Sequence, residues 1–180
     1  PKGGPDGPST NEVGIRPEVV ERVITELGAP SPSLDAFASS QSRHLRVCDS
    51  YWTAKDSAWK KHWGPHRGLL WIHCPRGDIA RAVAKISKDR TRAVLVVPMG
   101  PLEEESTRDW VLSLETMTLN KTTIPEGESV YQDAMGQALP HQRWRTSFHY
   151  VDGSLDQEGS QDSWCVNRIV AEPWRLCFAA

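Results

Sequence analysis

The sequence predicts an α/β fold in which a parallel sheet is covered by helices on both faces. The first observation is the order strand, helix, strand between Leu69 and Val97, which is typical of this class. The second is that Ala93–Val97 is apolar at every position, as expected for a strand buried on both faces. The third is length, because 180 residues are enough for one domain with a substantial core.

The first half of the chain is marked by helix caps and chain breaks. Residues 1–14 are rich in glycine and proline and are interpreted as a flexible leader or linker. Pro17 and Gly28 bracket a run of apolar residues at helical spacing, so a capped amphipathic helix is expected between them. Residues 33–38 are predicted to form a short strand, and residues 56–63 a short helix.

The second half carries the clearest strand and helix patterns. Leu69–Ile72 is predicted to be a buried strand, and Ile79–Ser87 a helix with Asp78 as its N-cap. Ala93–Val97 is expected to lie beside Leu69–Ile72 as a parallel strand, connected through that helix in a right-handed crossover. Pro98 is expected to end this strand because proline has no backbone donor.

The remaining elements complete one predicted domain. A helix is expected from about Ser106 to Thr116, and a strand over Arg143–Val151. Residues 15–152 are therefore assigned to the domain. Residues 153–180 are expected to form a C-terminal extension that packs on it, with one or two strands between Trp164 and Phe178.

Composition narrows the function classes. The net charge of −2 gives no overall field that would recruit nucleic acid. No apolar run approaches the ~20 residues that a membrane span needs. Cys48, Cys74, Cys165 and Cys177 contain no CxxC pair, which argues against a zinc ribbon and favours reduced thiols in an intracellular compartment.

The segment His73-Cys74-Pro75-Arg76 lies between a predicted strand and a predicted helix, where α/β proteins often bind ligands. Cys74, close to the helix N-terminus, is expected to have a lowered pKa and to alkylate readily. A cysteine phosphatase is a remote alternative, since its loop needs five residues between cysteine and arginine. Here six separate Cys74 from Arg81, which turns a helical side chain by roughly 100°.

A metal site is not predicted. His62, His66, His73 and Cys74 are close in sequence, but Gly64-Pro65 separates the first two. No single helix would align these side chains, so they are interpreted as exposed or packed residues.

Several short motifs occur in a fixed order along residues 15–152. They are Asp35-Ala36-Phe37-Ala38-Ser39, then Tyr51-Trp52-Thr53 with Asp56, then Trp59 and Trp63, then Trp71-Ile72-His73-Cys74-Pro75, and finally Lys85-Ile86-Ser87-Lys88-Asp89 ahead of Leu95-Val96-Val97-Pro98. The ordered set resembles phage-type (Dam-like) adenine-N6 DNA methyltransferases. It also resembles the methyltransferase-like segment of DIRS-type retroelement polyproteins. The resemblance implies a three-layer, Rossmann-like sheet of methyltransferase type.

The resemblance also implies S-adenosylmethionine as a cofactor. Asp35 would accept hydrogen bonds from its ribose hydroxyls or face its methionyl ammonium, and Phe37 would belong to the same loop. Asp56 would accept from the cofactor's adenine amino group. Taken singly, Asp35 and Asp56 also fit ordinary capping roles at the ends of a strand and a helix.

In the family, an Asn-Pro-Pro-Tyr loop holds the flipped adenine, with the amide as acceptor and the aromatic ring as stacking partner. This chain has His73, Cys74, Pro75 and Arg76 at those positions, so only the second proline is kept. The interpretation is a degenerate, noncatalytic methyltransferase-like module of a retroelement-derived, and therefore nuclear, protein that binds nucleic acid or protein. The alternative is an active S-adenosylmethionine-dependent DNA adenine methyltransferase with an altered loop.

A basic stretch between residues 55 and 81 is the candidate nucleic-acid surface. Its cations are Lys55, Lys60, Lys61, Arg67, Arg76 and Arg81. Trp59, Trp63 and Trp71 are interleaved with them and would provide stacking platforms for DNA or RNA. The alternative is that the tryptophans belong to the core and the lysines to a solvated helix face.

Overall fold

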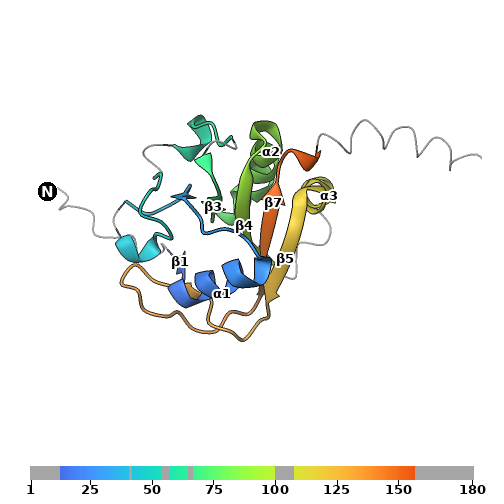
Figure 1. Cartoon of the computed structure of the whole chain (residues 1–180). Coiled ribbons are helices and arrows are strands. Elements are labelled where there is room, and N and C mark those ends of the chain that lie inside the picture. Colours follow the sequence, from blue (N-terminus) through green and yellow to red (C-terminus); the bar gives the residue numbers. More distant parts are fainter. Residues whose placement is uncertain (1–12, 41, 54–56, 65–66, 100–107, 157–180) are drawn as a thin grey trace, which may run out of the picture.

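A computed structural model describes residues 13–40, 42–53, 57–64, 67–99 and 108–156 (Figure 1). Its centre is a five-stranded sheet with the order β2-β3-β4-β7-β5. The strands are β2 (Leu34–Asp35), β3 (Leu70–Ile72), β4 (Arg92–Met99), β5 (Thr118–Ile124) and β7 (Arg145–Asp152). β2, β3 and β4 are parallel, whereas β7 runs antiparallel to both β4 and β5. The fold is therefore mixed α/β.

Helices cover both faces of the sheet, as the sequence predicts. They are α1 (Pro17–Leu27), α2 (Ile79–Asp89) and α3 (Arg108–Met117). Successive residues of β4 point to opposite faces: Val94 and Val96 pack in the cluster that contains α1 residues, while Leu95 and Val97 pack with residues of α2 and α3. This alternation explains why β4 is apolar throughout.

The predicted unit of strand, helix and parallel strand is confirmed. β3 and β4 are adjacent and parallel, with Leu70 opposite Ala93, and α2 connects them. The predicted helix after Pro17 is also confirmed: it ends at Gly28, whose φ of 61° is the left-handed conformation that glycine adopts without strain.

Several boundaries differ from the sequence prediction. Pro98 does not end β4 but pairs with Thr146 inside it. This is tolerated because β3 ends opposite Leu95, so β4 has one neighbour at this point. Asp78 stands at the N-cap of α2 but makes no capping hydrogen bond, since Arg76–Asp78 form a 3-10 turn. The short helix expected over residues 56–63 is only a 3-10 turn, Ala58–Lys60.

The sequence did not predict β5, nor the small antiparallel sheet of β1 (Gly14–Ile15) and β6 (Tyr131–Gln132). Because Gly14 pairs with Gln132, it belongs to the domain and not to the expected leader. At the other end, the Ser87 hydroxyl donates to the Asp156 carboxylate at 2.6 Å, so the start of the C-terminal extension packs on α2. The strands expected between Trp164 and Phe178 lie outside the described residues.

Candidate functional site

Two adjacent cavities lie beyond the carboxyl ends of β2 and β3. The Asp35 cavity, of about 390 Å³, is lined by residues that include Asp35, Phe37, Val47, Trp71, His73 and Pro75. The aromatic cavity, of about 600 Å³, is lined by residues that include His73, Pro75, Arg76, Tyr131, Arg143 and Trp144. His73, Cys74 and Pro75 line both, so this segment lies between them. It therefore lies at the carboxyl end of β3, beside both cavities.

Asp35 ends β2 and is almost fully buried, with 2% of its surface exposed. Its Oδ1 accepts a hydrogen bond from the Phe37 amide at 3.2 Å, and its Oδ2 accepts one from the Val47 amide at 3.0 Å. Burial raises the pKa of Asp35 to about 6, although the two amides and the nearby Arg46 act in the opposite direction. The side chain is thus a buried acid beside a cavity, with its negative charge only partly compensated.

The Arg46 guanidinium, whose charge lowers the pKa of Asp35, also has other partners. Its Nε donates to the Ser39 carbonyl at 2.9 Å, and its guanidinium lies 4.0 Å from the centre of the Tyr51 ring. Tyr51 forms a parallel bridge with Asp35 on the outer side of β2. Asp56, the other predicted cofactor residue, and Lys55 lie outside the described residues.

Phe37 connects the Asp35 cavity to an aromatic cluster. Its ring contacts Trp59 edge-on at 5.0 Å and Trp63 at 6.0 Å, and Trp59 stacks on Trp63 at 5.6 Å between ring centres. Trp63 and Trp71 are fully buried. The hypothesis that these two offer stacking platforms is therefore wrong, and the alternative of a core role holds for both.

The loop after β3 contains a neutral imidazole and a buried thiol. Burial lowers the pKa of His73 to about 4, so the ring is uncharged at pH 7. Cys74 is 4% exposed, and burial, together with the charge of Asp78, raises its pKa to about 12. The expectation of an acidified, reactive Cys74 is wrong, because the thiol is buried and the 3-10 turn separates it from α2. The raised pKa of Cys74 also argues against the cysteine phosphatase alternative, because that chemistry needs a thiolate.

Tyr131 and Trp144 are site residues that the sequence reasoning missed. Tyr131 is buried in β6, and its hydroxyl is 3.1 Å from the Thr146 hydroxyl. Trp144 is 40% exposed, and its ring centre is 6.4 Å from that of Tyr131. The signal that could have found them is the sequence Arg143-Trp144-Arg145, in which an aromatic residue lies between two cations.

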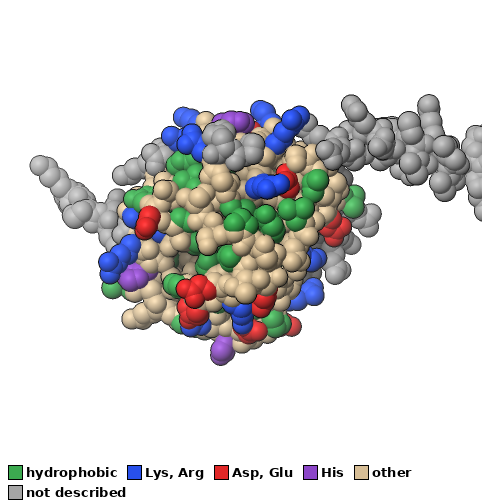
Figure 2. All heavy atoms as spheres, viewed as in Figure 1, with side chains coloured by type: hydrophobic (Ala, Val, Ile, Leu, Met, Phe, Trp, Pro, Cys, Tyr) green, Lys and Arg blue, Asp and Glu red, His purple; other side chains and the backbone are tan. Residues whose placement is uncertain are grey.

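The predicted basic residues do not all lie together. Arg67 precedes β3 and Arg76 follows it, so the two lie at opposite ends of that strand. Arg81 lies on α2, with its guanidinium 4.2 Å from the centre of the Trp59 ring, so it is close to the exposed Lys60 and Lys61, which follow Trp59 in the chain. On the face shown in Figure 2, several Lys and Arg side chains lie along the upper edge, and others lie beside acidic side chains.

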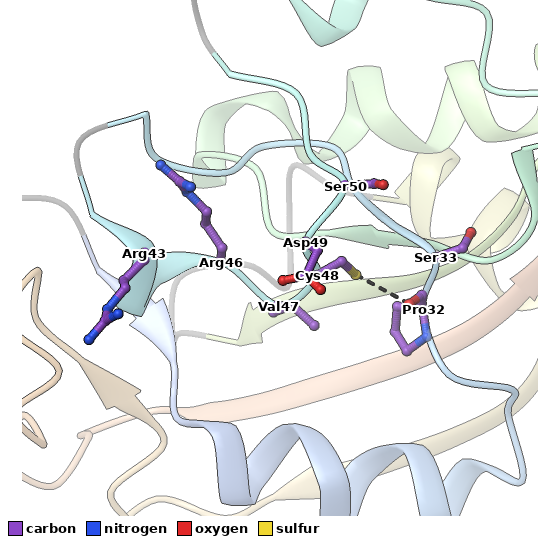
Figure 3. A pocket seen from close by; sticks show the side chains of 8 residues that line it. All are labelled: Pro32, Ser33, Arg43, Arg46, Val47, Cys48, Asp49 and Ser50. Atoms are coloured by element: carbon purple, nitrogen blue, oxygen red, sulfur yellow. Dashed lines mark hydrogen bonds between the residues drawn. The ribbon is translucent and has the colours of Figure 1, made fainter.

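A further cavity, of about 500 Å³, lies next to Cys48 (Figure 3). The Cys48 thiol donates to the Pro32 carbonyl at 3.3 Å, and burial raises its pKa to about 12. Arg43 and Arg46 extend away from the thiol, so the polar groups do not converge on one ligand position. This cavity is therefore a weaker candidate than the cleft at the strand ends.

The described residues contain no group of three or more His, Cys, Asp or Glu side chains arranged to hold a metal ion. In the same part of the chain, no helix is both long and apolar enough to cross a membrane. Comparisons with protein-family models, curated proteins and solved structures find no match to this chain.

Proposed function

We propose that this chain is a methyltransferase-like module that binds S-adenosylmethionine in the Asp35 cavity, associates with nucleic acid, and does not methylate adenine. The observation that carries the proposal is the buried, incompletely compensated carboxyl group of Asp35 beside a cavity of about 390 Å³. A retroelement origin rests on the motif resemblance alone.

The strand order supports the methyltransferase part of this proposal. The resemblance implies a layered sheet with helices on both faces, and three parallel strands, β2, β3 and β4, lie side by side in the sheet. β7 lies between β4 and β5 and is antiparallel to both. The bridge between Tyr51 and Asp35 adds a chain segment on the other side of β2, so the strand that carries Asp35 is internal at its carboxyl end.

The chemistry of the Asp35 cavity supports a cationic ligand. A carboxyl group whose pKa is raised by burial gains stability when a positive charge approaches it. S-adenosylmethionine carries an ammonium and a sulfonium, and the cavity volume is in the range of small-molecule sites. Phe37 and Trp71 provide apolar walls for the uncharged parts of such a ligand.

The loop after β3 supports the absence of adenine methylation. A methyl transfer to the adenine amine needs an acceptor close to its N–H groups, and the carboxamide of the family is replaced by His73. The aromatic partner is replaced by Arg76, which is exposed. Removing one well-placed polar group from a catalytic site commonly costs ~10²–10³ in rate, so the combined changes leave little activity.

Calorimetric titration with S-adenosylmethionine tests the cofactor proposal. The natural chain should bind, the Asp35→Asn variant should lose binding, and Asp49→Asn, which alters an exposed carboxylate outside this cavity, should bind normally. Thermal melts of all three proteins verify that they are folded. Undiminished binding by Asp35→Asn, or no binding by the natural chain, would contradict the proposal.

Radiolabelled methyl transfer to unmethylated single-stranded and duplex DNA tests the catalytic part. We expect no transfer by the natural chain. A His73→Asn, Cys74→Pro, Arg76→Tyr triple variant, which restores the family loop, provides the comparison. Clear transfer by the natural chain would establish the active enzyme instead, and transfer by the triple variant alone would support both the ancestry and the loss.

A further inference from the structure

The outer face of α2 and the loop of residues 57–63 beside it carry basic side chains that take no part in the cofactor site. We name this surface the α2 patch, and its members are Lys60, Lys61, His62, Arg81, Lys85 and Lys88. We propose that the α2 patch is a docking surface for an acidic peptide segment of a partner protein, with Arg81 binding one of its carboxylates. This inference goes beyond the proposed function and does not depend on it.

Three contacts hold the loop alongside α2, each between one side chain of the loop and one of the helix. They are the Arg81 guanidinium at 4.2 Å from the centre of the Trp59 ring, the Lys85 ammonium at 5.1 Å from that of Trp63, and His62 Nδ1 at 3.5 Å from the Asp89 carboxylate. The three helix residues follow one another at four-residue spacing, so they lie on one side of α2. In Figure 1, α2 lies at the top of the molecule, and Lys and Arg side chains line the upper edge of the same view in Figure 2.

The α2 patch has more positive charge than its acidic neighbours balance. Four of its side chains are exposed and form no ion pair with an acid of the described residues: Lys60, Lys61, Arg81 and Lys88. The acids of α2 and its N-cap are Asp89 and Asp78, and Asp89 already pairs with Lys85 at 2.7 Å. Asp156, beside the helix, accepts a hydrogen bond from Ser87. An acidic segment would supply the counter-charges that this surface lacks.

Arg81 is positioned for a carboxylate before any partner binds. Its guanidinium lies over the Trp59 ring, and it donates no hydrogen bond to the described residues, so its N–H groups remain available for a bidentate pair. Trp59 itself is held by the stacked Trp63 ring and by Phe37. Arg81 would therefore lose little side-chain freedom on binding, which favours affinity.

The uncharged part of this surface favours a peptide over a nucleic acid. Ala80 and Ala84 are exposed one turn apart on α2, beside Lys88, so aliphatic side chains of a peptide can come close to the helix. The rings that a nucleic acid would need for base stacking are covered, because Trp63 is buried and Trp59 lies between Trp63 and Arg81. A segment in which acidic residues alternate with aliphatic ones matches both the cations and the alanines.

Fluorescence anisotropy with a labelled peptide tests the docking. The probe is a Glu-Glu-Leu repeat of about nine residues, whose extended length of about 30 Å exceeds that of α2. The natural chain should bind it, and a peptide with Gln in place of every Glu should bind at least about tenfold more weakly.

Charge reversal locates the binding surface. The double variant Lys61→Glu, Lys88→Glu should bind the acidic peptide about tenfold more weakly or worse, because each change removes an attraction and adds a repulsion. The matched control is Arg43→Glu, Lys121→Glu, which changes the net charge equally at exposed cations outside the α2 patch. This control should weaken binding much less, and thermal melts verify that both variants are folded.

Replacement of Arg81 separates a specific carboxylate pair from diffuse attraction. Arg81→Lys keeps the charge but cannot form two parallel N–H···O bonds with one carboxylate, so affinity should fall about threefold. If the double variant fails to fold, Arg81→Lys and the Gln peptide decide the proposal. Equal affinity of Arg81→Lys and the natural chain would contradict the assigned role of Arg81.

A DNA single strand of about 15 nucleotides and its duplex distinguish a peptide surface from a nucleic-acid surface. The Lys61→Glu, Lys88→Glu variant should bind both DNAs no more weakly than the control variant does. The proposal would be overturned by no binding of the acidic peptide, by equal weakening in the two double variants, or by a loss of DNA affinity as large as the loss of peptide affinity. The α2 patch does not line the Asp35 cavity, so both variants should titrate with S-adenosylmethionine as the natural chain does.

Discussion

Replacement of Asp35 by Asn should change how the stability of the protein depends on pH. Burial raises the pKa of Asp35 from 3.8 to about 6 in the folded chain. One pKa unit corresponds to 1.36 kcal/mol, so the ionised carboxylate costs the fold about 3 kcal/mol relative to the protonated form. Since the side chain is only 2% exposed, solvent screening removes little of this cost.

The sign follows from which state ionises first. As pH rises, the unfolded chain loses the Asp35 proton near pH 3.8 and the folded chain near pH 6. The contribution of this group to stability is therefore fully present below pH 3.8 and is lost as pH rises through 6. Between pH 4.5 and 7.5, the natural chain should lose about 2 kcal/mol that the Asn variant keeps.

Urea unfolding of both proteins at these two pH values measures the effect. Asn keeps one acceptor for the Phe37 or Val47 amide and loses the other, which lowers its stability by about 1 kcal/mol. Comparison of the pH-dependent change between the two proteins removes the part of this loss that does not depend on pH, and also the contributions of the other titrating groups. The reasoning would be refuted if both proteins showed the same change in unfolding free energy. Asp49→Asn serves as the control for a carboxylate that is exposed.

Three further predictions concern packing and reactivity. Gly153→Ala should lower the unfolding free energy by about 3 kcal/mol or more, because the added Cβ would lie 2.0 Å from the Ile86 carbonyl oxygen. Gly77→Ala is the control and should be neutral, because no atom lies within 4 Å of its added Cβ; thermal melts of both variants measure the difference. Asp89→Ala should cost about 1–3 kcal/mol at pH 7 by removing the acceptor of the buried Trp63 amide at 2.9 Å. Burial opposes ionisation of Asp89, but Lys85, the Trp63 amide and His62 outweigh burial and lower the pKa of Asp89. The loss of stability in Asp89→Ala should therefore shrink as pH falls through that pKa, measured by urea unfolding. An equal loss at pH 2 and pH 7 would contradict this prediction. Cys74 should react with iodoacetamide much more slowly in the folded chain than in urea, because its pKa is raised to about 12, and equal rates by peptide mass spectrometry would show that the thiol is not protected.

Local patterns were sufficient for part of this fold. The apolar run of β4, the helical spacing in α2 and the apolar β3 predicted two parallel neighbouring strands connected by a helix, and the structure has them. These elements can be predicted from a short stretch of sequence. A strand that is buried on both faces, or a helix with one apolar face, has a spacing of apolar residues that is typical of its surroundings. The position of the His73–Arg76 loop at the strand ends follows from the same reading.

The other elements depend on partners far along the chain. β5 is a mostly polar edge strand that follows α3 without a break, and β6 has two residues that are a strand only because β1 pairs with them. The aromatic cavity could not be predicted for this reason, since the Tyr131 ring lies near His73 and Trp144 only when segments far apart in the sequence have paired.

Burial was decided by the tertiary structure as well. The sequence determined that Asp35 ends a strand and that Cys74 follows one, but not that both would be enclosed and have raised pKa values. It placed three tryptophans among the cations, and only packing decided that Trp63 and Trp71 belong to the core. The physical reason is that secondary structure responds to neighbours within a few residues, whereas desolvation depends on every element that closes over a side chain.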